Sequence, residues 1–290
     1  MTTKSPKNDI DTIINNLSQL NYTFGENQLA EDEVLQIKNQ AKDARGRYGL
    51  NAPIGTNIFS FLEQKGDIVF QLQDFKDSEL DAMIIKYSAK SKKKYIIINS
   101  DKPLINQIFA AAHEFYHYLY SFIGNSQNTI VCTFSKNDKE EIKANRFAAE
   151  FLLPEEALRD EVNSFIKFMD GKFVNAPLTR RIIFCFYLTT KYSLPLKAVM
   201  YRLKEEQISD TDYLLNHYDE VKQLLLDYSK SDSHVEELYS KKNEYLTEQL
   251  YSLVPYLYNK GRLDDSTVDE IIKQFSLSEK QILEDLIKDE

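Results

Sequence analysis

Alternating and clustered apolar residues predict a small group of β-strands in the first half of the chain. The segments with this pattern are 67–73 (DIVFQLQ), 79–87 (ELDAMIIKY) and 94–100 (KYIIINS). The lysine-rich stretch SAKSKKK between the second and the third predicts a hairpin turn whose lysines are solvated. We therefore expect an antiparallel sheet of about three strands.

Helical signals dominate the rest of the chain. The segments 31–47 and 57–64 combine helix-favouring residues with start and stop signals, and a longer helix is expected from about residue 102 to residue 122. Another should span 137–153, where Pro154 ends it and opens the next helix. Further helices are predicted at 178–192, 195–207, 210–228, 233–258, 264–274 and 279–288. The expected fold class is therefore α+β, mainly helical with one small sheet.

The composition limits the cellular compartment and the kinds of partner that we expect for this chain. The chain has 290 residues and a formal net charge of −9, so the molecule as a whole does not attract nucleic acid or anionic membranes. No segment approaches the roughly 18 apolar residues of a membrane span, and the N-terminus lacks the apolar run of a secretory signal. Its two cysteines, Cys132 and Cys185, lie far apart, which is typical of a reducing compartment. We expect a cytoplasmic protein without direct nucleic-acid binding or membrane contact.

The segment 113–117, HEFYH, carries the candidate chemistry. On a helix, residues four apart share a face, so His113 and His117 can place two imidazole nitrogens on one cation. Glu114 projects about 100° away around the helix, beside the cation. This is the H-E-x-x-H arrangement of two zinc ligands and a carboxylate that accepts a proton from water. Because the flanking residues are apolar, burying these groups without partners would be costly.

A catalytic zinc site needs a third protein ligand and one open position. The later histidine of the metzincin pattern is absent, since Tyr120 and Ile123 occupy the required glycine and histidine positions. Glu141 on the following helix is the preferred candidate, and Asn145, one turn further on the same face, could hydrogen-bond a ligand. Glu140 is the nearest competitor, but its side chain points about 100° away from that of Glu141.

Three other residues are weaker candidates for a metal ligand. A thiolate binds zinc well, but we expect Cys132 to be a buried free cysteine. His217 and His234 lie in the C-terminal region, where we expect them to be ordinary surface histidines. None of the three is therefore preferred over Glu141.

Two further features could complete a peptidase cleft. Tyr116, Tyr118 and Tyr120 are close to the motif in sequence and are candidate donors to the oxyanion of the transition state. The strand that ends near Tyr87 could be a free edge that receives the substrate as an added strand.

Two sequence blocks at this spacing resemble the ImmA/IrrE family of metallopeptidases. They are HEFYH at 113–117 and EIKANRFAAEFLLP at 141–154, and the similarity extends over about residues 30–207. The resemblance implies a zincin-like, gluzincin-type metallopeptidase core that holds one zinc ion (Zn2+). It also implies that Glu141 is the third ligand, with Glu114 as the catalytic carboxylate.

The resemblance also divides the chain. It implies an N-terminal arm at 1–29, a metallopeptidase domain at 30–207 and a C-terminal helical region at 208–290. Inside the metallopeptidase domain, Phe115 and Tyr116 replace the leucine and glycine that the family usually has. These bulky residues could narrow the cleft or alter helix packing.

The function implied by the resemblance is that of an intracellular zinc-dependent endopeptidase, a hydrolase that cuts a peptide bond in a regulatory protein. The expected substrate is a DNA-binding helix-turn-helix repressor, or an antitoxin, of a mobile element or stress system. The alternative is a metal-stabilised protein-binding module, or a toxin–antitoxin or phage-defence component, with little or no proteolysis. Glu114→Gln separates these hypotheses, because it removes the proton acceptor. The sequence assigns no oligomeric state.

Overall fold

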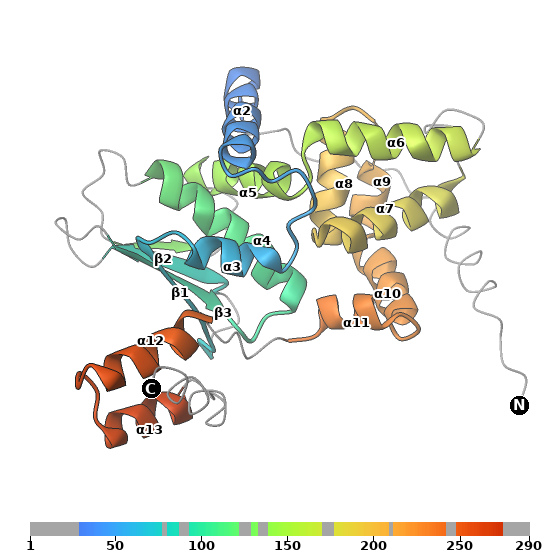
Figure 1. The fold of residues 1–290 in the computed structure, drawn as a ribbon. Coiled ribbons are helices and arrows are strands. Elements are labelled where there is room, and N and C mark those ends of the chain that lie inside the picture. The colour runs from blue at the N-terminus through green and yellow to red at the C-terminus, as the bar shows by residue number, and fades with distance from the viewer. Residues whose placement is uncertain are drawn as a thin grey trace, which may run out of the picture.

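A mainly helical α+β fold with one small sheet confirms the predicted fold class (Figure 1). The structure, a computed structural model, describes residues 29–76, 80–86, 93–121, 129–132, 139–169, 177–208, 211–241 and 248–274. The predicted N-terminal arm, apart from Leu29, most of the lysine-rich turn and the predicted helix 279–288 lie outside the described residues.

The described helices follow the predicted ones closely. In chain order they are α2 (Glu31–Arg47), α3 (Asn57–Glu63), α4 (Leu104–Tyr116), the π-helix η1 (His117–Ser121), α5 (Lys139–Leu152), α6 (Glu155–Met169), α7 (Leu178–Tyr192), α8 (Leu196–Glu205), α9 (Asp212–Asn216), α10 (Tyr218–Ser229), α11 (Ser233–Tyr239), α12 (Glu248–Asn259) and α13 (Asp265–Gln274). The segment predicted as one helix at 210–228 divides at His217, and the one at 233–258 divides after Tyr239. α4 begins at Leu104, with Pro103 as its N-terminal cap residue.

The sheet has four strands in the order β1-β3-β2-β4. They are β1 (Ile68–Gln73), β2 (Ala82–Lys86), β3 (Lys94–Asn99) and β4 (Thr129–Cys132). β2 runs antiparallel to both β3 and β4, whereas β1 runs parallel to β3. The expected antiparallel sheet of about three strands is thus corrected to a mixed sheet, with β4 as an additional strand.

Both differences have a physical cause. The chain passes from β1 to β2, two positions along the sheet, so that β3 returns between them and runs parallel to β1. A four-residue apolar run such as TIVC at 129–132 does not by itself distinguish a strand from another buried segment. Because β4 pairs with β2, the strand expected as a free edge near Tyr87 is an interior strand.

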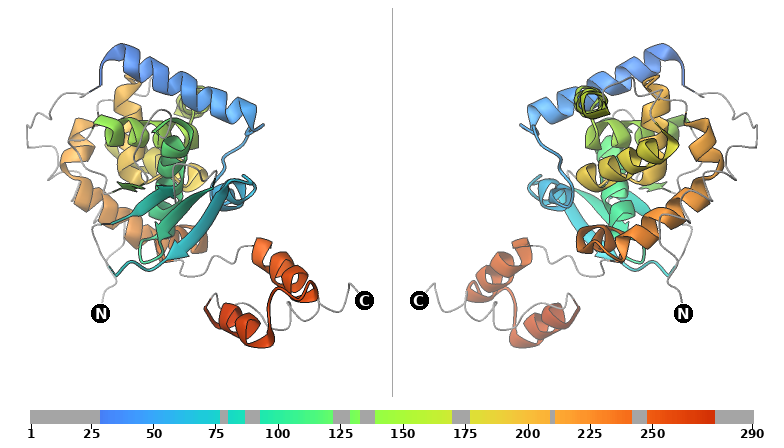
Figure 2. Two further views of the ribbon diagram at one scale, coloured as in Figure 1. Left: turned by 90° about the vertical axis from the view of Figure 1, so that its left-hand side faces the viewer. Right: turned by 90° about the vertical axis from the view of Figure 1, so that its right-hand side faces the viewer.

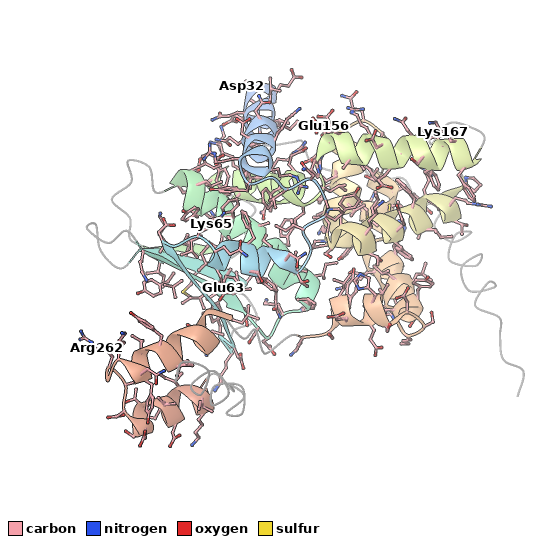
Figure 3. All side chains as sticks on the ribbon, in the orientation of Figure 1. Asp32, Glu63, Lys65, Glu156, Lys167 and Arg262 are labelled. Carbon is pink, nitrogen blue, oxygen red and sulfur yellow. The ribbon has the colours of Figure 1, made fainter. Side chains whose placement is uncertain are left out.

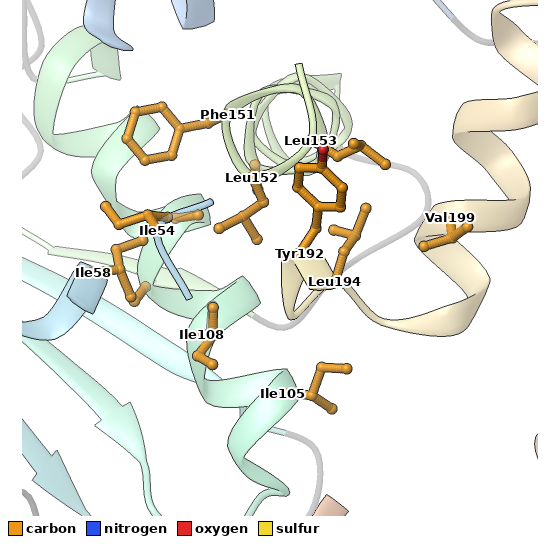
Figure 4. Close-up of a cluster of buried hydrophobic side chains, with 14 of the residues drawn as sticks. Ile54, Ile58, Ile105, Ile108, Phe151, Leu152, Leu153, Tyr192, Leu194 and Val199 are labelled. Atoms are coloured by element: carbon orange, nitrogen blue, oxygen red, sulfur yellow. The ribbon is translucent and has the colours of Figure 1, made fainter. Parts of the chain in front are cut away.

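The helix α4 occupies the centre of the fold. It contacts β2 and β3 on one side and packs closely against α5 on another, while α2 covers α5 (Figures 1 and 2). Ala144 and Ala148 of α5 are fully buried, as expected for small residues at a close helix contact. Apolar side chains from α3, α4, α5, α8 and the segment after α7 meet in one core (Figure 4), among them Ile58, Ile108, Leu152, Leu194 and Val199.

The C-terminal helices differ in how they relate to this core. α9, α10 and α11 contribute buried side chains to it, including Leu214, Leu225 and Leu238. α12 and α13 contribute none among the described residues, and they lie apart from the other helices in Figure 2. Among the described residues, α9–α11 therefore pack onto the core and α12–α13 do not.

Charged side chains occupy the outer faces of the helices. Asp32 of α2 and Glu156 and Lys167 of α6 project outward (Figure 3) and are exposed. Within the described part of the chain, no helix is both long and apolar enough to cross a membrane.

Candidate metal centre

The end of α4 and the start of α5 bring the predicted ligands together. His113 and Glu114 lie in the last turn of α4, and His117 is the first residue of η1. Glu141 lies in the first turn of α5. The side chains of His113 and His117 are 0% and 1% exposed, and that of Glu141 is 8% exposed. The three residues predicted as ligands therefore meet inside the protein.

The ligand atoms converge on one point. The Nε2 atoms of His113 and His117 are 3.0 Å apart. The two carboxylate oxygens of Glu141 each lie 3.2 Å from one of these nitrogens, Oε2 from that of His113 and Oε1 from that of His117. Atoms bound at about 2.0–2.1 Å to a tetrahedral zinc ion are about 3.3 Å apart, so the observed spacing suits such an ion. Among the described residues, this is the one group of three possible ligands close enough to hold a metal.

The hydrogen bonds behind the imidazoles leave both Nε2 atoms available to a metal. The Nδ1 of His113 lies 2.9 Å from Oδ1 of Asn145, and the Nδ1 of His117 lies 2.8 Å from Oγ of Ser121. When each Nδ1 carries a hydrogen and donates it, each Nε2 presents a lone pair. Two lone pairs and a carboxylate would then face one another, and a cation between them removes the repulsion. Nitrogen and oxygen donors in this number fit a catalytic zinc ion.

The electrostatics of the ligands favour the forms that bind a metal. Burial lowers the pKa of His113 and so favours the neutral imidazole. Burial acts to raise the pKa of Glu141, but its close contacts with the imidazoles of His113 and His117 outweigh it and lower the pKa to about 2. At neutral pH the neutral imidazole of His113 and the ionised carboxylate of Glu141 are therefore favoured, and these are the states that coordinate zinc.

Glu114 differs from Glu141 in its surroundings. Its side chain is fully buried, and neither carboxylate oxygen has a hydrogen-bond partner among the described residues. Burial, followed by the nearby charge of Glu141, raises its pKa well above the ordinary value. A carboxyl group in this environment binds a proton readily, as a general base that later acts as an acid must do.

The bulky residues inside the motif pack into the core. Phe115 is fully buried, and its ring lies 5.1 Å from that of Phe61 and 5.4 Å from that of Phe151. The ring of Tyr116 lies 5.5 Å from that of Phe147 and meets that of His117 edge-on at 5.6 Å. The departures from the family pattern therefore fill the junction of α3, α4 and α5.

The competing ligand candidates lie elsewhere. Glu140 is exposed and pairs with Lys143 and the hydroxyl of Tyr116. The Nδ1 of His217 contacts the carbonyl of Tyr213, and His234 lies in the first turn of α11. Cys132 ends β4, and its side chain lies outside the described part of the structure.

The three tyrosines considered as oxyanion donors are engaged with other groups. Tyr118 donates to Asp67, Tyr116 to Glu140 and Tyr120 to the carbonyl of Gln40. The structure therefore gives no support to any of them as the donor.

Sequence reasoning missed two features of the site. The first is Ser121, which lies four residues after His117 on the same helical segment and could have been found from that spacing. The second is a buried ion-pair network behind α5, in which Arg202 of α8 contacts Glu150 at 2.8 Å and Glu206 at 2.7 Å. Arg146 of α5 also contacts Glu206, at 2.9 Å. Side chains from two distant segments of the sequence, 146–150 and 202–206, make this network, so no local pattern indicates it.

An H-E-x-x-H helix whose imidazoles meet a glutamate from the next helix is a candidate metal centre of the kind found in metallopeptidase-like proteins. Residues 64–204 match the model of peptidase family M78, described as the IrrE N-terminal-like domain. This segment therefore matches the ImmA/IrrE family, as the two motif blocks indicated.

The remaining comparisons add little. A solved structure of a Mycobacterium tuberculosis transcriptional regulator is similar with a TM-score of 0.39 and 12% sequence identity, over 69% of this chain and 52% of that one. The chain thus spans about half the length of that regulator. No curated protein sequence matches the chain significantly.

Proposed function

We propose that this chain is a zinc-dependent endopeptidase that hydrolyses a peptide bond in a regulatory protein. The observation that carries the proposal is the convergence of two imidazole Nε2 atoms and the Glu141 carboxylate, next to a buried Glu114. Membership of a peptidase family supports the same reaction class.

Each of the four residues has a distinct part in this proposal. His113, His117 and Glu141 would hold the zinc ion, which supplies a Lewis acid that acidifies water and polarises the scissile carbonyl. Glu114 accepts a proton from the attacking water on a carboxylate oxygen and then passes it to the leaving amine. The raised pKa of Glu114 suits this double task, because the group must hold the proton between the two transfers.

The substrate proposed is a helix-turn-helix repressor or an antitoxin. Its support is the resemblance of the two motif blocks to the ImmA/IrrE family, together with a net charge of −9 that gives this chain no general attraction to DNA. In this proposal the chain binds and cuts the regulator directly, and only the regulator contacts DNA.

Metal analysis and two variants test the metal and the reaction separately. The purified protein should contain about one zinc ion per chain, and His113→Ala should lose it. Glu114→Gln should keep the zinc, because Glu114 is not among the converging ligands, yet it should lose hydrolysis. Cleavage is read by mass spectrometry of new protein N-termini in cells that express either form, and with the repressor encoded beside the gene as purified substrate. A Glu114→Gln variant that still produces the same new N-termini would overturn the proposal.

One observation favours the second candidate, a metal-stabilised protein-binding module that does not cut. The four site residues are all buried, and Glu114 is fully so. A substrate carbonyl must reach this point for hydrolysis, whereas a binding module needs no such access. If Glu114→Gln binds its partner and retains full biological activity, the binding module is the correct function.

A further inference from the structure

We infer that Ser121 is a positioning residue for the metal ligand His117. Its hydroxyl oxygen accepts the Nδ1–H of His117 and thereby directs Nε2 of that ring toward His113 and Glu141. The inference rests on the proposed metal site, and it concerns a residue outside both motif blocks.

The geometry of η1 carries this inference. The regular α-helix ends at Tyr116, and His117–Ser121 form a π-helix that widens the turn. Within it, Oγ of Ser121 lies 2.8 Å from Nδ1 of His117, whose side chain is 1% exposed. The hydroxyl is the partner that fixes the ring and shields its Nδ1–H from solvent. π-Helical turns recur at functional sites, where they reposition a side chain.

Tyrosine hydroxyls on this turn hold it in place from two directions. Tyr118 donates to Asp67 beside β1 at 2.8 Å, and Tyr120 reaches the carbonyl of Gln40 on α2 at 3.4 Å. The turn is therefore attached both to the sheet region and to α2. This attachment places Ser121 over His117.

The two imidazoles are oriented by different parts of the fold. Asn145, the partner of His113, lies on α5 together with Glu141, so a movement of α5 would disturb both. Ser121 lies on the same segment as His117 and does not depend on α5. Loss of the serine hydroxyl should therefore affect His117 selectively and leave the contact between His113 and Asn145 intact.

The test measures zinc affinity by competition with a chromophoric chelator, with zinc ions alone as the probe. Ser121→Ala should weaken zinc binding by about tenfold or more, because partners that orient ligands typically contribute 10–100-fold to metal affinity. Ser121→Thr restores the hydroxyl and should bind zinc within about threefold of wild type. Ser164→Ala is the matched control, since the Ser164 hydroxyl also bonds within its helix, to the carbonyl of Asp160, but far from the site in sequence.

An NMR signature separates positioning from a general loss of structure. The chain has four histidines, so ¹⁵N spectra of the zinc-loaded protein can be assigned with His217→Gln and His234→Gln. In wild type the Nδ1–H of His117 should be protected from solvent exchange, and in Ser121→Ala it should exchange rapidly, while the Nδ1–H of His113 stays protected. Thermal melting of the zinc-free variants checks that they fold.

The outcomes distinguish this inference from the proposed function. If the wild type binds no zinc, the proposed function fails first. If the wild type binds zinc and Ser121→Ala binds it equally well, only the role of Ser121 is wrong. The role is equally wrong if Ser121→Thr binds zinc as weakly as Ser121→Ala, because the hydroxyl would then not be the cause.

Discussion

Replacing Glu141 by glutamine should remove most of the metal affinity, whereas the same change at its neighbour Glu140 should leave it intact. The carboxylate of Glu141 lies 3.2 Å from Nε2 of both His113 and His117. Glu140 is exposed and bonds to Tyr116 and Lys143. The two substitutions are chemically identical and adjacent, so they differ only in the direction of the side chain.

The expected loss follows from the number of ligands. Zinc sites with four protein ligands bind with about 10–16 kcal/mol, which is about 2.5–4 kcal/mol for each ligand. At about 1.4 kcal/mol per factor of ten, losing one charged ligand should weaken binding by roughly a hundredfold or several hundredfold. The amide oxygen of glutamine keeps a weak interaction, so the loss should not greatly exceed a thousandfold.

Competition titration with a chromophoric chelator measures the affinity, and thermal melting with zinc or with EDTA measures its effect on stability. Zinc at about a thousand times its dissociation constant stabilises the folded protein by about 4 kcal/mol, and this stabilisation should be nearly absent in Glu141→Gln. Zinc affinity within threefold of wild type in Glu141→Gln would refute the reasoning. An equal loss in Glu140→Gln would refute it too, because the direction of the side chain would then not matter.

Three further predictions concern stability and pH. Phe147→Ala should destabilise the protein by about 3–5 kcal/mol in urea unfolding, because this fully buried ring contacts Phe115 and Phe151 at the junction of α4 and α5. A loss of stability below about 1 kcal/mol would contradict that packing. Arg202→Ala should cost about 3–5 kcal/mol, because it removes the partner of buried carboxylates. Lys42→Ala at an exposed ion pair should have a much smaller effect, and equal effects would show that burial of the network is unimportant. Glu114→Gln should stabilise the metal-free protein at pH 8 more than at pH 5. Because folding raises the pKa of Glu114, the folded state keeps this proton above about pH 4.5, whereas the unfolded state releases it. The stability of the wild type therefore falls as the pH rises toward the pKa of Glu114 in the folded state. Melting temperatures in EDTA at both pH values check this, and a pH-independent difference would count against it.

The sequence was sufficient to predict which residues meet at the centre of the candidate site. The spacing of His113 and His117 on a helix, and the position of Glu141 on the next helix, follow from helical periodicity alone. Asn145 lies one turn after Glu141 on the same face and contacts the predicted ligand His113. Local geometry decides each of these contacts once the two helices are adjacent.

The features that could not be predicted from the sequence depend on contacts between distant segments. The parallel pairing of β1 with β3 depends on where the chain crosses the sheet, and no residue in either strand encodes that choice. Tyr118 and Tyr120 of the π-helix bond to Asp67 and Gln40, which are 51 and 80 residues away in sequence. The pairing of Arg202 with Glu150 likewise requires α8 to lie against α5.

The same dependence on distant segments reaches the start of the motif helix. α4 has no side-chain cap at Pro103, and the N–H of Leu104 donates instead to the carbonyl of Ser240 at 2.8 Å. Leu104 is 1% exposed, so leaving this donor without a partner would cost about 1–3 kcal/mol. A β-bridge between Pro103 and Lys241 and an ion pair of Lys241 with Asp101 reinforce the contact. Ser240 lies beyond the family match, which ends at residue 204. The helix that carries His113 is therefore anchored by the segment after α11, and α9–α11 belong to the structure that positions the metal centre.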